Sequence, residues 1–313
     1  MSPILAALLF VGALFLVIRG ATLATGYALK LAESFHLSKY TVGFIIIAVI
    51  SILPETFISL SSSFQGMPSF GLGMLFGSNI ADLTLIFGLI VLLAKRGIRI
   101  EAKVLKNRFV YPLLLLLPLV MGLDGYFSRA EGIALILAGS IFYYTALKDE
   151  VRASATPKQD PTTRRRNVIL LLGSMVLLLV GSHLTVESAS VLARAFGVSP
   201  ILIGMLVVGL GTTMPEFFFA LKSVKRRNDA MAVGDLLGTV LADATVVVGL
   251  LALVRPFDFP QHIIYVTGVF MVLASIILFA FMRSKRTLSR TEAVILLVIW
   301  LIFALTEFWM NTR

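Results

Sequence analysis

Four acidic residues that lie inside long apolar stretches of this 313-residue chain most need a chemical explanation: Glu55, Asp82, Glu216 and Asp243. A charge at the centre of a bilayer costs at least about 2.5–3.5 kcal/mol on insertion scales, so such a group needs a partner or a function. No Lys or Arg lies at comparable depth in the four stretches that carry these acids. We therefore expect the missing positive charge to come from a bound cation.

The backbone beside the two glutamates favours a cation site. Pro54 cannot donate a hydrogen bond to the carbonyl of Ile50, and Pro215 cannot donate one to that of Gly211. Carbonyls freed at 50–51 and 211–212 would point towards whatever the glutamates hold, because lipid cannot satisfy them.

Hydroxyl groups accompany the two aspartates. Ser78 and Asp82 are four residues apart, as are Thr239 and Asp243, so each pair shares one face of a helix. Carboxylates, hydroxyls and carbonyls form an all-oxygen environment, and a cage that removes the ion's water favours Ca²⁺ over Mg²⁺. No histidine or sulfur ligand accompanies these acids and the chain has no cysteine, which argues against zinc or copper.

The elements that position these residues are predicted to be transmembrane helices. Apolar residues make up 58% of the chain and charged residues 14%, against about 45–50% and about 25% in soluble domains. This composition excludes a soluble enzyme and a disordered chain. Stretches long enough to cross a bilayer, at about 20 residues each, occupy roughly 3–30, 41–62, 70–93, 109–124, 130–147, 167–194, 199–221, 231–254, 261–282 and 289–309.

The net charge of +10 follows the predicted topology. Of the 27 Lys and Arg residues, 22 lie in connectors on one side of the ten spans, and only Arg129, Arg194, Arg255 and Arg313 lie on the other. By the positive-inside rule, both termini are expected outside the cell and the polar linker 148–166 in the cytoplasm. The basic residues therefore do not indicate nucleic-acid binding.

The chain contains an internal repeat at an offset of 161 residues. GFIIIAVISILPETF from Gly43 corresponds to GMLVVGLGTTMPEFF from Gly204, and GMLFGSNIADLTLIFG from Gly73 corresponds to GDLLGTVLADATVVVG from Gly234. Because each copy holds an odd number of spans, the second would be inserted upside down. We predict an all-α integral membrane fold of ten transmembrane helices in two inverted five-helix repeats, a pattern typical of secondary transporters. The first repeat would cover 1–147 (motif 43–88) and the second 167–313 (motif 204–249).

The paired Pro-Glu motifs, each followed 27 residues later by an aspartate, resemble the two alpha repeats of the calcium/cation antiporter superfamily. The chain is most similar to the branch of prokaryotic sodium/calcium exchangers. The resemblance implies that helices 2, 3, 7 and 8 surround the ions while helices 1 and 6 slide across them. It implies Glu55 and Glu216 as central calcium ligands, with carbonyls from Ser51 and Thr212. It also implies flanking sodium or proton subsites, to which it assigns Ser78, Asp82, Thr239 and Asp243.

Two departures from the family pattern concern the coupling ion. Ile52 replaces a hydroxyl expected at a sodium subsite, whereas Thr213 keeps the corresponding one, and Asp82 stands where sodium exchangers commonly have Asn. One Ca²⁺ neutralises only half of four ionised carboxylates, so we expect at least one of them, with Asp82 the candidate, to hold a proton when calcium is bound. The driving ion stays open between Na⁺ and H⁺.

Four further polar residues in the spans receive structural interpretations. Asp235 is expected near a helix start, where it would complement the helix dipole, with a cation funnel as the alternative. His183 and Glu187 are expected to pair with each other, with a proton relay as the alternative. Arg19 is expected to snorkel to the membrane surface or to join helices.

The sequence thus predicts a cell-membrane antiporter, without a cofactor, that exports Ca²⁺ in exchange for Na⁺ or H⁺. Its partners would be inorganic cations and the lipid bilayer, not nucleic acid, and the transport unit would be a monomer. A Ca²⁺/H⁺ antiporter without sodium coupling, a cation channel and an intramembrane enzyme with paired acids are the alternatives. A channel usually forms its pore at an oligomer axis or a filter loop, and the acids related by the repeat explain transport better than catalysis.

Overall fold

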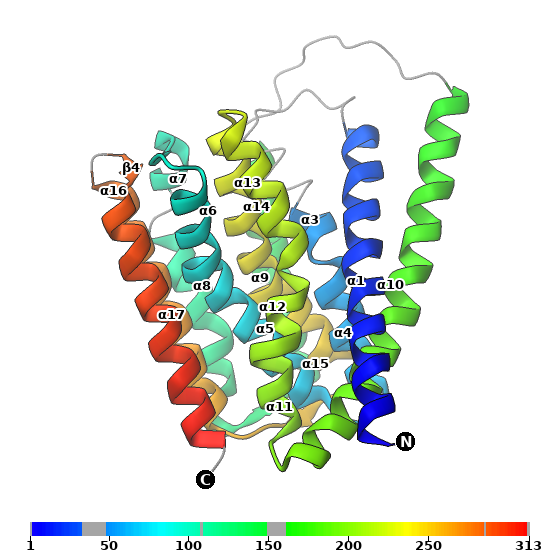
Figure 1. The fold of residues 1–313 in the computed structure, drawn as a ribbon. Helices are drawn as coiled ribbons and strands as arrows, with labels where there is room; N and C mark the ends of the chain where they lie inside the picture. Colours follow the sequence, from blue (N-terminus) through cyan, green and yellow to red (C-terminus); the bar gives the residue numbers. More distant parts are fainter. Residues whose placement is uncertain (1, 33–47, 107–108, 149–160, 285, 312–313) are drawn as a thin grey trace.

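The computed structural model describes residues 2–32, 48–106, 109–148, 161–284 and 286–311, which form a bundle of helices (Figure 1). Within these residues, seven segments are long and apolar enough to cross a bilayer, and a shorter apolar helical segment covers Val110–Asp124. The seven are Pro3–Ala24, Pro68–Leu93, Thr162–Phe196, Pro200–Lys225, Asp229–Val254, Ile263–Arg283 and Arg290–Met310. An all-α membrane fold is therefore confirmed. Residues 41–47 of the second predicted span and most of the linker lie outside the described residues.

The helices of the first half of the chain are α1 (Pro3–Ala32), α3 (Ala48–Ser51), α4 (Leu53–Phe64), α5 (Pro68–Ala81), η2 (Asp82–Ile86), α6 (Phe87–Leu93), α7 (Ala102–Lys106), α8 (Val110–Met121), η3 (Gly122–Asp124) and α9 (Arg129–Lys148). Those of the second half are α10 (Pro161–Phe196), α11 (Pro200–Ile203), η4 (Gly204–Val208), α12 (Gly209–Thr212), α13 (Met214–Lys225), α14 (Asp229–Ala242), η5 (Asp243–Val247), α15 (Val248–Val254), η6 (Ile263–Gly268), α16 (Val269–Arg283) and α17 (Arg290–Asn311).

Two helical segments form the centre of the bundle. In Pro68–Leu93 and Asp229–Val254, 83% and 78% of the most apolar window is buried, against 22% in Arg290–Met310. Helices α1 and α10 pack along each other at one side of the bundle, and α17 lies at the opposite side (Figure 1). Apart from a small number of buried polar residues, the central segments are apolar around most of their circumference, because protein surrounds them.

Close backbone contact brings the central segment of one half against the broken helix of the other. A Cβ atom added at Gly77 of α5 would lie 2.3 Å from the carbonyl oxygen of Met205 in η4. Only glycine permits this approach. It holds the polar end of α5 beside α12.

Two short antiparallel strand pairs join connectors from different halves of the chain. Strand β1 (Ile98–Arg99) pairs with β4 (Thr287–Leu288), and β2 (Tyr126–Phe127) pairs with β3 (Phe257–Asp258). Because both pairs lie at helix ends, they fix how the two halves meet.

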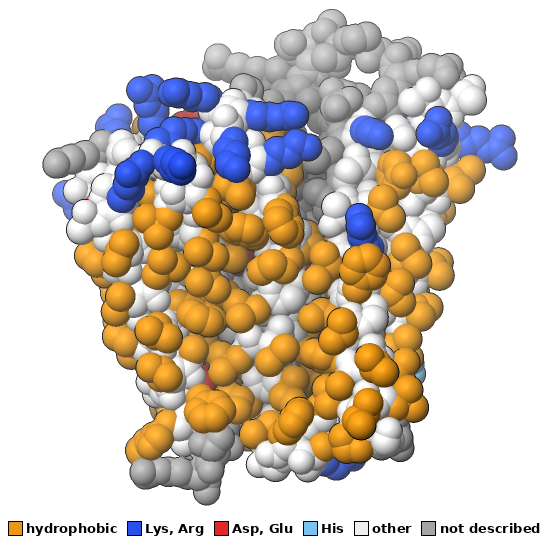
Figure 2. All heavy atoms as spheres, in the orientation of Figure 1, with side chains coloured by type: hydrophobic (Ala, Val, Ile, Leu, Met, Phe, Trp, Pro, Cys, Tyr) orange, Lys and Arg blue, Asp and Glu red, His pale blue; other side chains and the backbone are white. Residues whose placement is uncertain are grey.

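Positive charge gathers at one end of the molecule. Figure 2 shows Lys and Arg side chains at the end where α13 and α16 finish, above a broad hydrophobic belt. Helix α1 begins and α17 finishes at the opposite end (Figure 1). The Lys and Arg side chains on this face thus gather at one end of the bundle, which agrees with the asymmetry predicted from the sequence.

Candidate cation-binding site

The helices that carry Glu55 and Glu216 are both interrupted one turn before the glutamate. Helix α3 ends at Ser51 and α4 begins at Leu53, while α12 ends at Thr212 and α13 begins at Met214. The intervening residues have nearly the same conformation, with φ −70° and ψ −3° at Ile52 and φ −75° and ψ −4° at Thr213. A proline near the start of the second helix accounts for each break, because it lacks the N–H that would continue the ladder.

The two aspartates begin π-helical turns. Asp82 opens η2 directly after α5, and Asp243 opens η5 directly after α14. Such turns are rare and occur frequently at functional sites. The wider turn here coincides with the predicted ligand position in both halves.

The structure brings the four predicted acids together in the buried centre. Glu55, Asp82, Glu216 and Asp243 are each at most 1% exposed. When ionised, Glu55 repels each of the other three. Both carboxylate oxygens of Asp82, Glu216 and Asp243, and one of Glu55, have no hydrogen-bond partner within the described part of the chain.

The predicted hydroxyl residues are buried in the same region: Ser51, Ser78, Thr212, Thr213 and Thr239. Three of them donate to carbonyls of their own helices, Ser78 to Leu75, Thr212 to Gly209 and Thr213 to Leu210. These hydroxyl oxygens therefore keep lone pairs for a cation. The hydroxyl of Thr239 has no partner among the described residues.

A fifth carboxylate, Asp235, belongs to the cluster although it is not among the predicted ligands. Helix α14 begins at Asp229, so Asp235 lies in its second turn and not at the helix start as expected. It is fully buried, accepts a 3.1 Å hydrogen bond from Ser51 Oγ, and is repelled by an ionised Glu55. Its other oxygen has no partner in the described residues. The sequence does contain a signal for this role, because Asp235 is an acidic residue in an apolar stretch that has no Lys or Arg nearby.

Two other expectations for polar residues have different outcomes. The expected contact between His183 and Glu187 is absent from the described structure; both are exposed, and His183 Nδ1 lies 3.3 Å from Gln65 Nε2. Arg19 is exposed on α1, with its guanidinium carbon 5.2 Å from the centroid of the Phe15 ring. Neither His183 nor Arg19 belongs to the carboxylate cluster.

Within the described residues, one ion pair forms, between Arg96 and Asp229 at helix ends, and no cation pairs with the central acids. Nor do three His, Asp or Glu side chains in this part of the chain stand close enough to hold one metal ion together. A cation here would therefore need neutral oxygens beside one or two carboxylates. The broken helices and the hydroxyl residues offer such oxygens.

Comparisons with known proteins agree with this fold and site. The family model of the sodium/calcium exchanger protein matches residues 5–148 and 166–309. The inner membrane protein YrbG of Escherichia coli K12 is 29% identical over 265 residues, which cover 80% of this chain and 80% of that protein. The putative antiporter CaxA of Alkalimonas amylolytica is 29% identical over 245 residues, covering 73% and 74%.

A solved structure shows the same fold. The sodium-calcium exchanger NCX_Mj, soaked with Na⁺ and Sr²⁺, matches with a TM-score of 0.71 at 26% identity, covering 96% of this chain and 98% of that chain. The family match, together with the buried acids of this membrane bundle, indicates a cation transporter, which is not an enzyme class. The chain belongs to the sodium/calcium exchanger protein family, and it is a multi-span calcium/cation antiporter.

Proposed function

We propose that this antiporter exports Ca²⁺ across the cell membrane in exchange for Na⁺, H⁺ or both, by alternating access. The observation that carries the proposal is the set of buried carboxylate oxygens around Glu55 without partners in the described structure. Buried anionic oxygens without a paired charge are costly. A transported Ca²⁺ compensates them, because it accepts several oxygen ligands with flexible geometry.

The proposed calcium ligands are Glu55 and Glu216, joined by the carbonyls of Ser51 and Thr212. The interruptions after Ser51 and Thr212 support this assignment, because each lies one turn before a glutamate and close to a proline that cannot donate a backbone hydrogen bond. Flanking subsites would take a second cation, and we assign to them Ser78, Asp82, Thr213, Thr239 and Asp243. All the ligands come from one chain, which favours a monomeric transport unit.

The proposed architecture is ten transmembrane helices in two inverted repeats, 1–147 and 167–313, joined by the linker 148–166. The helix boundaries support the repeat: adding 161 to the bounds of α3, α4, α5, η2 and α6 gives those of α12, α13, α14, η5 and α15. The family model also matches the chain in two segments, 5–148 and 166–309. The long α1–α10 pair would be the element that slides across the core.

Orientation is proposed from the charge asymmetry, with the basic end of Figure 2 in the cytoplasm and both termini outside. A reporter within 156–162 should then be cytoplasmic, and one fused after Arg313 should be external. If both reporters appear on the same side, the number of spans between them is even, and a second repeat of five spans is impossible.

The coupling ion is proposed to include protons. Glu55, Asp82, Glu216 and Asp243 bring four negative charges into a dry site, and Asp235 adds a fifth, whereas one Ca²⁺ supplies two positive charges. The residual charge favours bound protons. Ile52 also removes a hydroxyl from a sodium subsite. A Ca²⁺/H⁺ antiporter without sodium coupling is therefore the second candidate.

The decisive experiment is ⁴⁵Ca²⁺ uptake into proteoliposomes under separately imposed Na⁺ and pH gradients, with the Glu55→Gln protein as the matched control. Exchange predicts saturable uptake that depends on at least one gradient and is lost in the control. Uptake driven by neither gradient, accompanied by non-saturating conductance, would identify a channel. Uptake driven by Na⁺ alone and indifferent to pH would remove protons from the proposal.

A further inference from the structure

A pocket of about 480 Å³ lies between α1 and α13, outside the cation site. Its walls include Phe15, Ile18 and Arg19 of α1 and Phe218, Phe219 and Lys222 of α13. The aromatic side chains are turned outwards, since Phe15 is 55% and Phe218 is 61% exposed. In a membrane-spanning bundle, such side chains contact lipid, so this pocket opens towards the bilayer.

Two cations within this pocket have no carboxylate partner in the described part of the chain. Arg19 and Lys222 are both exposed, and neither forms an ion pair there. Arg19 lies inside the apolar segment Pro3–Ala24, where an uncompensated charge is costly. Its contact with Phe15 supplies a cation–π interaction but no anion.

A second pocket of about 230 Å³ continues from the first towards the basic end of the molecule. The two pockets share Phe219 and Lys222, and the second adds Arg226 and Asn228. Together they form a mainly apolar groove that carries Arg19, Lys222 and Arg226 along its length. The groove thus offers cations for a phosphate group and apolar surface for an acyl chain.

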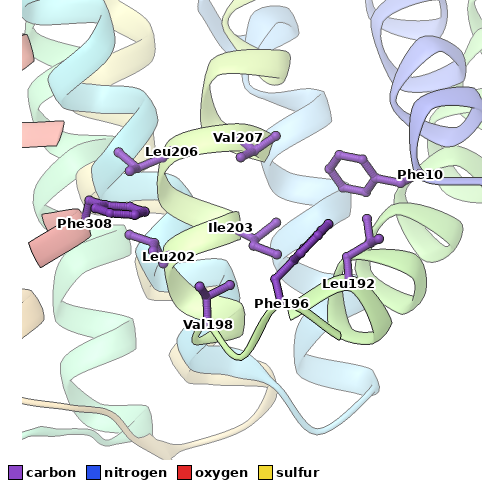
Figure 3. A pocket seen from close by; sticks show the side chains of 9 residues that line it. All are labelled: Phe10, Leu192, Phe196, Val198, Leu202, Ile203, Leu206, Val207 and Phe308. Carbon is purple, nitrogen blue, oxygen red and sulfur yellow. The ribbon is translucent and has the colours of Figure 1, made fainter. Parts of the chain in front are cut away.

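A third pocket, of about 390 Å³, provides a contrast within the same protein. It lies between α1, α10, α11, η4 and α17, and its lining is wholly apolar, with Phe10, Phe196 and Phe308 among its residues (Figure 3). Nothing in it could recognise a headgroup. The selective feature of the α1–α13 groove is therefore its cations.

We propose that the groove between α1 and α13 binds an anionic phospholipid. Its phosphate group would lie between Arg19 and Lys222, and an acyl chain would lie against Phe15 and Phe218. Basic pockets between transmembrane helices are suited to acidic lipid headgroups. A soluble anion would gain nothing from the exposed aromatic wall, which favours the lipid as the source of the phosphate. None of the carboxylates of the proposed cation site lines this groove.

Native mass spectrometry of the full-length protein tests the proposal. The purified protein is titrated with phosphatidylglycerol or with phosphatidylcholine of the same acyl chains, in a neutral detergent. We expect phosphatidylglycerol to bind preferentially, and the double variant Arg19→Gln/Lys222→Gln to bind it roughly tenfold more weakly or worse. Soluble glycerol phosphate at the same concentration should not displace the lipid.

The matched control is the double variant Arg165→Gln/Arg283→Gln, which removes the same charge from exposed positions outside the groove. It should retain wild-type phosphatidylglycerol binding, and all proteins should share one melting temperature and one size-exclusion profile. Equal losses in both double variants would reduce the effect to general charge and overturn the site. Equal binding of the two lipids, or displacement by glycerol phosphate, would overturn the assignment to an anionic lipid.

Discussion

The two halves of the chain share one backbone plan. The interruption at Ile52 matches that at Thr213 within a few degrees of φ and ψ, and η2 and η5 begin at corresponding aspartates. Their contacts correspond too. Gly88 of α6 approaches α17, and its counterpart Gly249 of α15 approaches α9, with added Cβ atoms 2.9 Å and 2.6 Å from carbonyl oxygens of the neighbouring helix. Glycines at corresponding positions therefore allow the same close helix packing in both halves.

The charges of the two halves differ within this shared plan. The second half has Asp235 where the first has Met74, and both side chains are fully buried. Asp235 reaches across to Ser51 of the first half, while Met74 cannot offer Thr212 a comparable acceptor. The comparison teaches that the backbone sets two equivalent ligand positions, while side-chain substitutions make the cation site asymmetric.

Neutralising either glutamate should have the largest effect, because the two occupy equivalent positions. Glu55→Gln and Glu216→Gln should each abolish ⁴⁵Ca²⁺ uptake, since an amide cannot replace a desolvated carboxylate as a calcium ligand. Both variants should still reach the membrane and elute as folded protein. Near-wild-type uptake by either one would show that the halves do not share the central site.

Neutralising Asp235 should have the next largest effect. Asp235→Asn keeps an oxygen that can accept the bond from Ser51 but removes a charge near Glu55. We expect calcium affinity, measured by isothermal titration, to fall roughly tenfold or more, because a Coulomb loss of about 1.4 kcal/mol already gives that factor. The matched control Met74→Leu should change affinity less than about twofold. Equal effects of the two substitutions would show that Asp235 acts through packing.

Sequence patterns were sufficient to predict the features of the backbone that occur in both halves of the chain. The offset of 161 residues and the two Pro-Glu motifs predicted where the helices break and which acids meet. Asp235 was not predicted as a member of the carboxylate cluster, because it has no acidic counterpart in the other half and because its contact with Ser51 depends on how α14 packs against α3. The His183–Glu187 pair was wrong because helical spacing permits a contact without requiring one, and His183 lies beside Gln65 of another helix.

The corresponding aspartates should differ in how pH affects them. Asp82 faces Glu55 and Glu216 on α4 and α13, Asp235 on α14 and Asp243 on η5, so a proton there relieves repulsion from four acids. Asp82→Asn should keep calcium binding but flatten the pH dependence of uptake between about pH 6 and 8. Asp243→Asn is the comparison and should retain a pH-dependent profile. An Asp82→Asn profile that overlays the wild type would contradict proton coupling through Asp82.

The smallest expected effect is on stability. It concerns two arginines, each of which contacts the opposite half of the chain. Arg96 donates to the carbonyl of Val224, and Arg255 donates to that of Ser63 at 3.4 Å, two carbonyls that correspond at the offset of 161. Only Arg96 also has a carboxylate partner, Asp229, at 2.5 and 2.8 Å. The hydrogen bond to Asp229 raises the pKa of Arg96, which stays charged.

Because of this difference, replacing each arginine should lower the free energy of unfolding by a different amount. Arg96→Gln should lower the free energy of unfolding by about 1–2 kcal/mol, because it leaves the largely buried Asp229 without its cation. Arg255→Gln should cost less than about 0.5 kcal/mol, since it removes one long hydrogen bond at an exposed position. Denaturation in detergent measures both, and a double-mutant cycle of Arg96→Gln with Asp229→Asn isolates the ion pair. A coupling energy near zero would mean that Arg96 stabilises the junction through Val224 alone, as Arg255 does through Ser63.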